Sequence, residues 1–121
     1  MVGIGIDAVD VERFRRLLVR RPAAAARLFT QYEQGFGARW HDPAPHLAAR
    51  FAAKEAVMKA MGVGIGAFAF HDVEVVSAPS GAPSLVLRGE AEALAGRLGV
   101  EAWRLSLTHT DSLAQAVAVA L

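Results

Sequence analysis

Hydrophobic residues alternate with small and acidic ones at the start of the chain, which predicts a β-strand over residues 2–7. Its Val and Ile side chains point to one face, while two glycines followed by Asp7 point to the other. Glycine weakens a strand and often marks a place where a ligand or another backbone comes close. Asp7 is therefore placed for chemistry, but it is equally suited to cap the following helix, a role for which Asp10 competes.

The period of the apolar positions then changes to that of helices. Residues 10–20 predict an amphipathic helix with arginines on its outer side, and residues 23–29 predict a second helix after a proline. Thr30 is expected to cap a short turn through Glu33. Residues 35–45 are rich in glycine and proline, so we expect a loop there and the most mobile part of the chain.

A long helix, two hairpins and a further helix complete the pattern. They are predicted at residues 46–61 (helix), 72–77 and 84–87 (first hairpin), 89–98 (helix), and 102–108 and 113–121 (second hairpin). This order predicts an α+β fold, a mostly antiparallel sheet with helices packed on one side, in a single domain over residues 1–121.

Length and composition narrow the class of protein. A chain of 121 residues, of which 54% are hydrophobic, is long enough for one globular domain with a real core. No apolar stretch is long enough to span a bilayer, and the N-terminus lacks the basic region of a signal peptide, so we expect a cytoplasmic protein without a membrane segment. The chain has no cysteine, which excludes disulfides and thiolate metal sites.

Arginine is concentrated near the N-terminus, although the net charge is only +1. The segment from residue 13 to residue 27 contains no acidic residue and these arginines: Arg13, Arg15, Arg16, Arg20, Arg21 and Arg27. Such a block indicates an anionic partner, namely nucleic acid, a membrane or an acidic protein. Few aromatic residues lie among the arginines, which disfavours single-stranded nucleic acid. A solvated face without any partner stays an equal alternative.

The chain has only two lysines, Lys54 and Lys59, and they flank Glu55 on the long predicted helix. Glu55 and Lys59 are one turn apart and suit an ordinary ion pair on a solvated helix. Glycines at every second position over residues 62–66 follow this helix. A phosphate loop opens a helix instead, so these glycines are a weak nucleotide signature, although their bare backbone can lie against a ligand.

Three histidines lie near predicted loops and turns. His41 and His46 have no other metal-ligating residues at suitable spacing, so we expect both at the surface. His109 lies in the turn of the second hairpin, where a histidine is by itself more often an exposed bystander than a functional group.

Two segments together resemble a known family signature. They are Gly3-Ile4-Gly5-Ile6-Asp7 and Arg50-Phe51-Ala52-Ala53-Lys54-Glu55-Ala56-Val57-Met58-Lys59-Ala60. This pair resembles the two-part motif of the 4′-phosphopantetheinyl transferases, and the short chain resembles their holo-[acyl-carrier-protein] synthase branch. Three further matches lie in order along the chain: Asp10-Val11-Glu12-Arg13-Phe14, Arg27-Leu28-Phe29-Thr30 and Ser106-Leu107-Thr108-His109-Thr110.

The resemblance implies an enzyme that moves the phosphopantetheine arm of coenzyme A to a serine of an apo acyl carrier protein, with release of adenosine 3′,5′-bisphosphate. It implies Asp7 and Glu55 as ligands of Mg²⁺, which typically takes one or two carboxylates together with waters and substrate phosphates. Either Glu55 or a metal-bound water would be the base for the serine hydroxyl. Lys59 and Lys54 would stabilise the charge of the diphosphate.

The resemblance also implies residues that bind coenzyme A. Arg50 and His109, with Thr110 beside it, match positions that contact its nucleotide, including the 3′-phosphate, and the loop that begins at Gly62 would line the same ligand. Relatives commonly carry Gly-Thr-Gly and a basic residue in this loop, where this chain has Val63 and Ala67. This departure leaves the role of the loop open.

Relatives of this length form homotrimers with a site at each subunit boundary, which implies a homotrimer here. Carrier proteins are strongly acidic, so the resemblance gives the arginine block a partner, with Arg13 and Arg20 as the expected contacts. Fatty-acid biosynthesis is the expected setting, but which carrier is served and whether acyl-coenzyme A is accepted stay open. The alternative is an inactive relative that only binds coenzyme A or an acidic partner.

Overall fold

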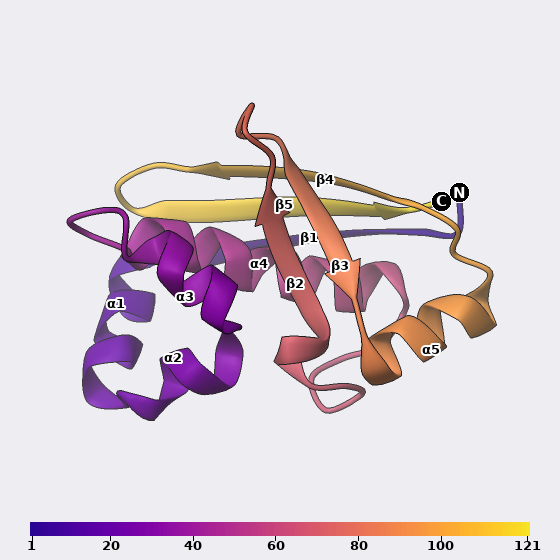
Figure 1. Cartoon of the computed structure of the whole chain (residues 1–121), viewed down its shortest axis with the longest axis horizontal. Coiled ribbons are helices and arrows are strands. Elements are labelled where there is room, and N and C mark those ends of the chain that lie inside the picture. Colours follow the sequence, from indigo (N-terminus) through magenta and orange to yellow (C-terminus); the bar gives the residue numbers. More distant parts are fainter.

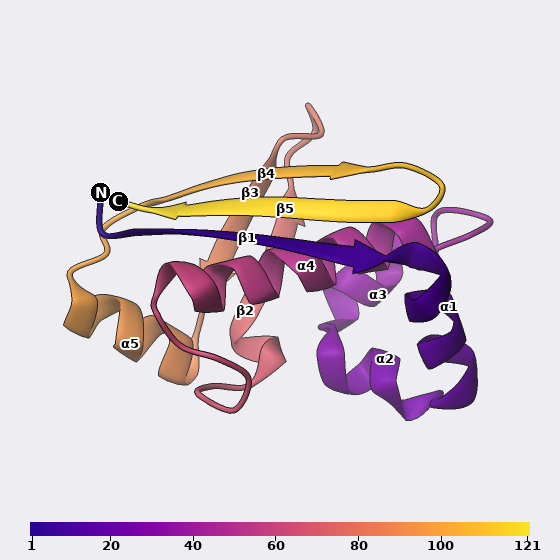
Figure 2. The same ribbon diagram turned by 180° about the vertical axis from the view of Figure 1, so that it is seen from behind.

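The long helix α4 lies along one face of a three-stranded antiparallel sheet, and the other helices lie on the same side (Figures 1 and 2). The computed structural model describes all 121 residues. Its elements are β1 (Gly3–Asp10), α1 (Val11–Arg20), α2 (Ala23–Leu28), α3 (Gln31–Gly37), α4 (Ala44–Ala60), the 3-10 turn η1 (Phe70–Asp72), β2 (Val73–Ser77), β3 (Pro83–Leu87), α5 (Gly89–Leu98), β4 (Trp103–His109) and β5 (Leu113–Ala120).

The strands form two antiparallel sheets. The larger has the order β1-β5-β4, and β2 and β3 form a separate hairpin. β1 is longer than predicted because it pairs with β5 along its whole length, from Gly3 opposite Ala120 to Asp10 opposite Leu113. The N- and C-termini therefore lie close together (Figure 2). The predicted α+β class is confirmed, and no helix is long and apolar enough to cross a membrane.

Small residues let α4 lie directly on the sheet. A Cβ atom built on Gly3 would be 1.9 Å from the carbonyl oxygen of Ala60, and one on Gly5 would be 1.9 Å from that of Ala56. The inner face of β5 carries only buried alanines next to them: Ala114, Ala116, Ala118 and Ala120. Of the two meanings that glycine can have in a strand, the structure supports the close approach of another backbone.

Asp10, and not Asp7, is the N-cap of α1. Asp10 caps α1, because its Oδ1 accepts a hydrogen bond of 2.8 Å from the backbone N–H of Arg13. Asp7 lies three residues earlier, on the glycine face of β1, and is free for another role. Thr30 caps α3 as predicted, in a capping box with Glu33.

The structure corrects the predicted loop over residues 35–45. α3 continues to Gly37 as a helix, and α4 begins at Ala44, so the irregular segment is confined to residues 38–43. The capping box and the packing of buried Glu33 stabilise this helix in spite of its two glycines.

The outer face of the larger sheet is apolar over β1 and β5 and polar over β4, and no element of the chain covers it. Ile4 and Ile6 of β1 are 59% and 60% exposed, and they lie opposite Val119 and Val117 of β5. Isolated exposed apolar side chains are common on protein surfaces, but neighbouring ones on adjacent strands form a continuous patch. Such a patch indicates contact with another protein surface.

Candidate functional site

Two hollows lie on either side of α4. The first, which we call the arginine–histidine cavity, has a volume of about 600 Å³ and lies between α3, α4, the β2–β3 hairpin and β4. The second, the carboxylate groove, has a volume of about 470 Å³ and lies between β1, α1 and α4. Arg50 and His109 line the cavity, and Asp7 and Glu55 line the groove.

Asp7 of β1 and Glu55 of α4 both line the carboxylate groove. Burial and the neighbouring charge of Asp7 raise the pKa of Glu55, and Lys59 opposes this shift only in part. The side chain of Asp7 is 16% exposed. Because burial and the charge of Asp7 both disfavour ionised Glu55, a bound cation would be stabilised in the groove.

Lys59 does not form the predicted pair with Glu55. Its ammonium group donates hydrogen bonds of 3.0 Å to Oδ1 of Asp7 and to the carbonyl oxygen of Ile6. The side chain of Lys59 is 52% exposed, so its charge also reaches solvent at the mouth of the groove. The i,i+4 spacing made Glu55 the expected partner, but the contact of α4 with β1 brings Asp7 nearer.

The donor set of the groove fits Mg²⁺. It has two carboxylates and no histidine, and no group of three or more His, Asp or Glu side chains that could hold a metal ion occurs in the chain. Mg²⁺ prefers oxygen ligands and usually keeps several positions for waters and substrate phosphates, so one or two carboxylates are sufficient.

Lys54 has a different place from the one predicted. Its side chain is fully buried, and its ammonium group lies 2.7 Å from Oε1 of Glu33 and 3.0 Å from the carbonyl oxygen of Phe70. Within this chain, the side chain of Lys54 points into the core and lines neither hollow, so nothing in its position supports the predicted contact with a diphosphate.

Arg50 lies in the wall of the arginine–histidine cavity. Its guanidinium stacks on Phe36 at 3.7 Å from the ring centroid, and Nη2 donates a hydrogen bond of 2.9 Å to Oγ of Ser77. Its Nε is buried without a hydrogen-bond partner. Burial lowers the pKa of Arg50. A buried cation with an unused donor, next to an open cavity, suits an anionic ligand.

Aromatic rings form the remaining wall of the cavity. His46 stacks on Trp40 with ring centroids 3.8 Å apart, and His109 lies edge-on to His46 at 4.9 Å. His46 is only partly exposed because it lies in the wall of the cavity, whereas His41 is exposed as predicted. Sequence reasoning missed Phe36, Trp40 and His46. Their spacing carries no signal because α3 and the following turn bring them together only in the tertiary structure.

Thr110 and Gly62 lie outside both hollows. The hydroxyl of Thr110 accepts hydrogen bonds from the backbone N–H groups of Ser112 and Leu113, at 3.3 and 3.1 Å, and so orders the β4–β5 turn. Gly62 has φ of +74° and opens an exposed loop after α4. Neither residue lines the arginine–histidine cavity within one chain, and their contact with coenzyme A stays a prediction.

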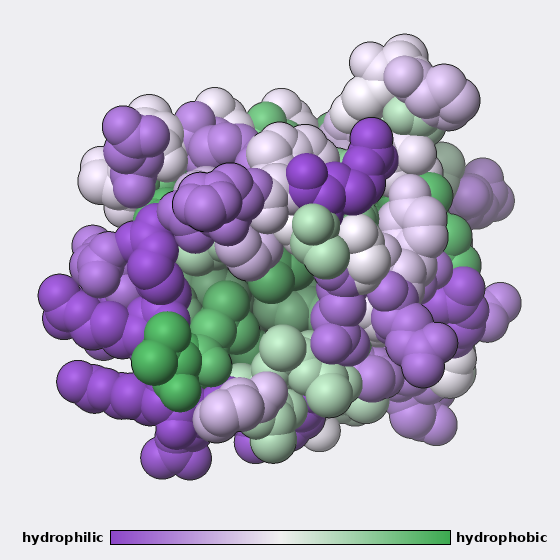
Figure 3. Space-filling model, turned by 60° about the vertical axis from the view of Figure 1, so that its left-hand side comes forward, coloured by the Kyte–Doolittle hydropathy of each residue, from purple (hydrophilic) through white to green (hydrophobic).

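The two arginines that were expected to bind a partner form no ion pair within the chain. Arg13 lines the carboxylate groove, and Arg20 ends α1. In contrast, Arg15 and Arg16 pair with Glu12, and Arg15 also pairs with Asp42. Figure 3 shows hydrophilic side chains around a small group of hydrophobic ones on the side that carries α1 and α2. Val19 on α1 is 74% exposed.

Comparison with known proteins identifies the family to which this chain is similar. A family model described as "4′-phosphopantetheinyl transferase superfamily" matches residues 3–118. The holo-[acyl-carrier-protein] synthase of Frankia alni is 49% identical over 120 residues, which cover 99% of this chain and 97% of the relative. That of Caldanaerobacter subterraneus is 40% identical over 118 residues, which cover 98% of this chain and 93% of the relative.

Solved structures agree with this similarity over the whole fold. The holo-[acyl-carrier-protein] synthase of Neisseria meningitidis superposes with a TM-score of 0.90 at 32% identity, covering 100% of this chain and 98% of that one. The Helicobacter pylori enzyme, in complex with coenzyme A, gives 0.86 at 29% identity, covering 98% and 99%. The Bacillus anthracis enzyme, in complex with CoA (3′,5′-ADP), gives 0.82 at 31% identity, covering 98% and 95%.

Proposed function

The chain belongs to the 4′-phosphopantetheinyl transferase superfamily, and we propose that it is a holo-[acyl-carrier-protein] synthase. The observation that carries the proposal is the carboxylate groove, which Asp7 of β1 and Glu55 of α4 line together, with Lys59 hydrogen-bonded to Asp7. In the reaction, the serine oxygen of an apo carrier protein forms a bond to the phosphorus that bears the pantetheine arm. The diphosphate P–O bond breaks, and adenosine 3′,5′-bisphosphate leaves with the electron pair of that bond.

Glu55 is the best candidate in this chain for the group that takes the serine proton. Its raised pKa makes it a stronger proton acceptor than an ordinary carboxylate when it is ionised. Lys59 supplies positive charge beside Asp7 for the oxygens of the diphosphate. Asp7 and Glu55 would hold Mg²⁺, which, when bound, neutralises charge on the diphosphate oxygens.

The arginine–histidine cavity is the proposed place for the nucleotide end of coenzyme A. Arg50 offers an unused buried donor to a phosphate, and His109 lies on the same cavity wall. The stacked rings of Trp40 and His46 offer a flat surface to the adenine base. A relative from Helicobacter pylori is described in complex with coenzyme A, which supports this ligand.

We propose a homotrimer in which neighbouring chains share each site. The groove lies at the β1 edge of the larger sheet and the cavity at the β4 edge, with β5 between them. Both hollows lie at the same end of the strands, because Asp10 and His109 pair with the adjacent residues Leu113 and Ala114. A ring of three chains would bring the β4 edge of one to the β1 edge of the next and cover the apolar outer face.

The proposed protein partner is an acidic acyl carrier protein in the cytoplasm, with fatty-acid biosynthesis as the setting. Arg13 is one of the groove residues and has no ion-pair partner, so it is positioned to bind an acid next to the incoming serine. Arg20, at the end of α1, extends this positive surface away from the groove.

A mass measurement tests the transfer directly. Incubation with coenzyme A, Mg²⁺ and an apo carrier protein is expected to add one phosphopantetheine group to the carrier. Glu55→Gln should lower the rate by about a hundredfold or more, because it removes a charge that acts in the transition state, while Glu101→Gln, at an exposed site, serves as the matched control. Binding of coenzyme A without any transfer, over a panel of carriers, would instead indicate a binding module.

Charge reversal tests the docking surface. Replacement of Arg13 and Arg20 by Glu is expected to raise KM for the carrier by about tenfold and to leave KM for coenzyme A within about twofold, since surface charge acts mainly on encounter. Arg97→Glu, on the exposed side of α5, is the control. An equal rise in both KM values would show that these arginines do not form a docking surface.

A further inference from the structure

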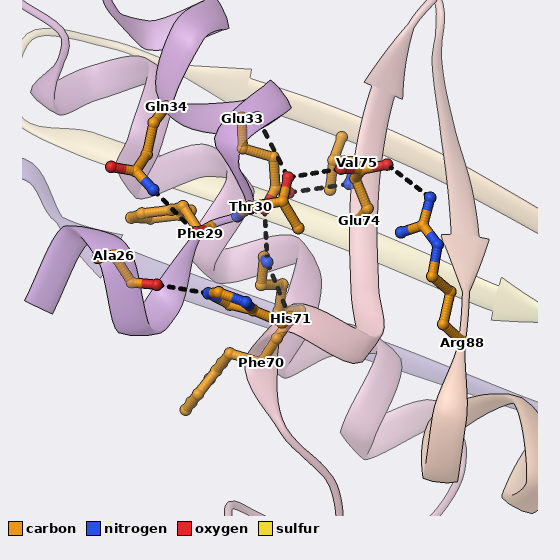
Figure 4. A network of polar contacts seen from close by, with 11 residues as sticks. Ala26, Phe29, Thr30, Glu33, Gln34, Phe70, His71, Glu74, Val75 and Arg88 are labelled. Atoms are coloured by element: carbon orange, nitrogen blue, oxygen red, sulfur yellow. Dashed lines mark hydrogen bonds and ion pairs between the residues drawn. The ribbon is translucent and has the colours of Figure 1, made fainter.

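A fully buried ion pair lies outside both hollows, and the proposed reaction does not use it. Lys54 of α4 and Glu33 of α3 are both 0% exposed, and their charged groups are 2.7 Å apart. The second hydrogen bond of Lys54 goes to the carbonyl oxygen of Phe70 at 3.0 Å. Figure 4 shows Glu33 pointing from α3 toward Val75 of β2.

Glu33 connects three elements through one carboxylate. Oε1 accepts hydrogen bonds from Nζ of Lys54 and from the backbone N–H of Thr30, at 2.7 and 3.0 Å. Oε2 accepts one of 2.9 Å from the backbone N–H of Val75. The donors come from α4, the N-terminal cap of α3, and the edge of β2 that does not pair with β3.

The same three elements form walls of the arginine–histidine cavity. α3 contributes Phe36, α4 contributes Arg50 one turn before Lys54, and β2 ends at Ser77. Arg50 contacts both of the other wall residues, since it stacks on Phe36 and donates to Ser77. The position of each relative to the others therefore depends on how α3, α4 and β2 are fixed behind them.

A contribution to the stability of the folded protein does not by itself explain why this ion pair is buried. Burial lowers the pKa of Lys54 even though Glu33 is its partner, so the ammonium group is not fully compensated for its loss of water. Replacement of a buried ion pair by uncharged groups of similar volume is often neutral or stabilising. Directional hydrogen bonds, in contrast, hold α3, α4 and β2 in one relative position.

We propose that Glu33 and Lys54 are positioning residues for coenzyme A: they lock α3, α4 and β2 together so that Phe36, Arg50 and Ser77 form a preorganised nucleotide pocket. The inference rests on the proposed function for the identity of the ligand. Small displacements of groups that hold a substrate can lower its affinity or rate strongly. The pair acts through the cavity wall and does not touch the ligand.

The double variant Glu33→Gln/Lys54→Met tests this role. It removes both charges, and the amide oxygen of the substituted side chain can accept from the backbone N–H of Val75 but not also from that of Thr30, so we expect the variant to fold with an unfolding temperature several degrees below that of wild type. The Kd for adenosine 3′,5′-bisphosphate, measured by calorimetry, and KM for coenzyme A should each rise about tenfold. The rate at saturating coenzyme A should change less than about twofold, because the carboxylate groove is intact.

Glu74→Gln is the matched control. Glu74 is also buried and accepts hydrogen bonds from Thr30 Oγ1 and Arg88, at 2.5 and 3.2 Å, but it makes no hydrogen bond to α4. We expect it to leave the Kd unchanged. A double variant that folds and binds as wild type, or a control that loses affinity to the same extent, would overturn the proposal.

Two further measurements cover the cases in which the double variant does not fold or the proposed function is wrong. If the double variant does not fold, Glu33→Gln alone, which preserves the shape of the side chain, should still raise the Kd, and an unchanged Kd would overturn the proposal. Failure of the proposed function is recognised separately, because wild-type protein would then add no mass to any carrier, while the Kd for adenosine 3′,5′-bisphosphate still reports on the pocket.

Discussion

At the scale of single residues, the histidine in the wall of the cavity shows how surroundings change an ordinary side chain. Burial lowers the pKa of His46, and the nearby charges of His109 and Arg50 lower it further, while Asp42 opposes them. The neutral imidazole is therefore favoured more in the folded protein than in the unfolded chain.

This shift predicts acid sensitivity. Below the ordinary histidine pKa of about 6.5, the unfolded chain takes up a proton at His46 before the folded chain does, so the free energy of unfolding falls as the pH falls through that range. His46→Phe should remove this loss. Urea titrations at pH 8 and pH 5.5 measure this effect. The free energy of unfolding of His46→Phe, relative to that of wild type, should be higher at pH 5.5 than at pH 8. The corresponding change for His41→Phe should be smaller. A relative stability that does not change with pH would contradict the assignment.

At the scale of elements, the contact between α4 and β1 positions the groove. The absence of side chains at Gly3 and Gly5 allows α4 to approach β1, and Asp7 follows on the same face of the strand, next to Lys59. The ion pair between Asp7 and Lys59 is a result of this approach. The arrangement of the charged groups at this site thus depends on the close approach of the backbones of α4 and β1.

Two glycine substitutions should have opposite effects on stability. Gly5→Ala would place a methyl group 1.9 Å from the carbonyl oxygen of Ala56, so we expect a loss of about 3 kcal/mol and a disturbed groove. Gly96→Ala, in α5, has no atom within 4 Å of the added Cβ and should gain about 0.5–1 kcal/mol. Equal effects in denaturant titrations would show that the packing of α4 on β1 is looser than described.

At the scale of the whole molecule, the two hollows at opposite edges of one sheet raise the question of which chain completes which site. The apolar outer face with Ile4 and Ile6 offers the surface for association. In the proposed trimer, Asp7 and Glu55 of one chain would work with Arg50 and His109 of the next.

Mixed trimers test the shared site. Glu55→Gln and His109→Ala should each be weakly active alone, but after unfolding and refolding together in equal amounts, about a quarter of the subunit boundaries should pair an intact groove with an intact cavity. Activity should return toward about a quarter of wild type. A mixture of Glu55→Gln with Asp7→Asn, both in the groove, should recover nothing. Lack of recovery in the first mixture, with trimers present by light scattering, would place both hollows of a site in one chain.

Local pattern was enough to predict much of the fold. The helix at residues 89–98 and the two hairpins depend on apolar periodicity and on glycine and proline between elements, which act over short distances. The family motif likewise singled out Asp7 and Glu55, which line one groove, and Lys59, which is hydrogen-bonded to Asp7. Their metal and catalytic roles stay predictions.

Other features were decided only by the tertiary structure. On helical spacing alone, Lys54 and Lys59 are equivalent neighbours of Glu55, yet one is fully buried against Glu33 and the other is half-exposed beside Asp7. His46 likewise became part of a cavity wall through α3, which was predicted only as a short turn and a loop. The physical reason is that burial and ion pairing depend on which elements pack against a residue, and those elements are distant in the sequence. The sequence alone determined which residues are candidates for the chemistry, and the packing of α4 against β1 and α3 decided which partner each of them has.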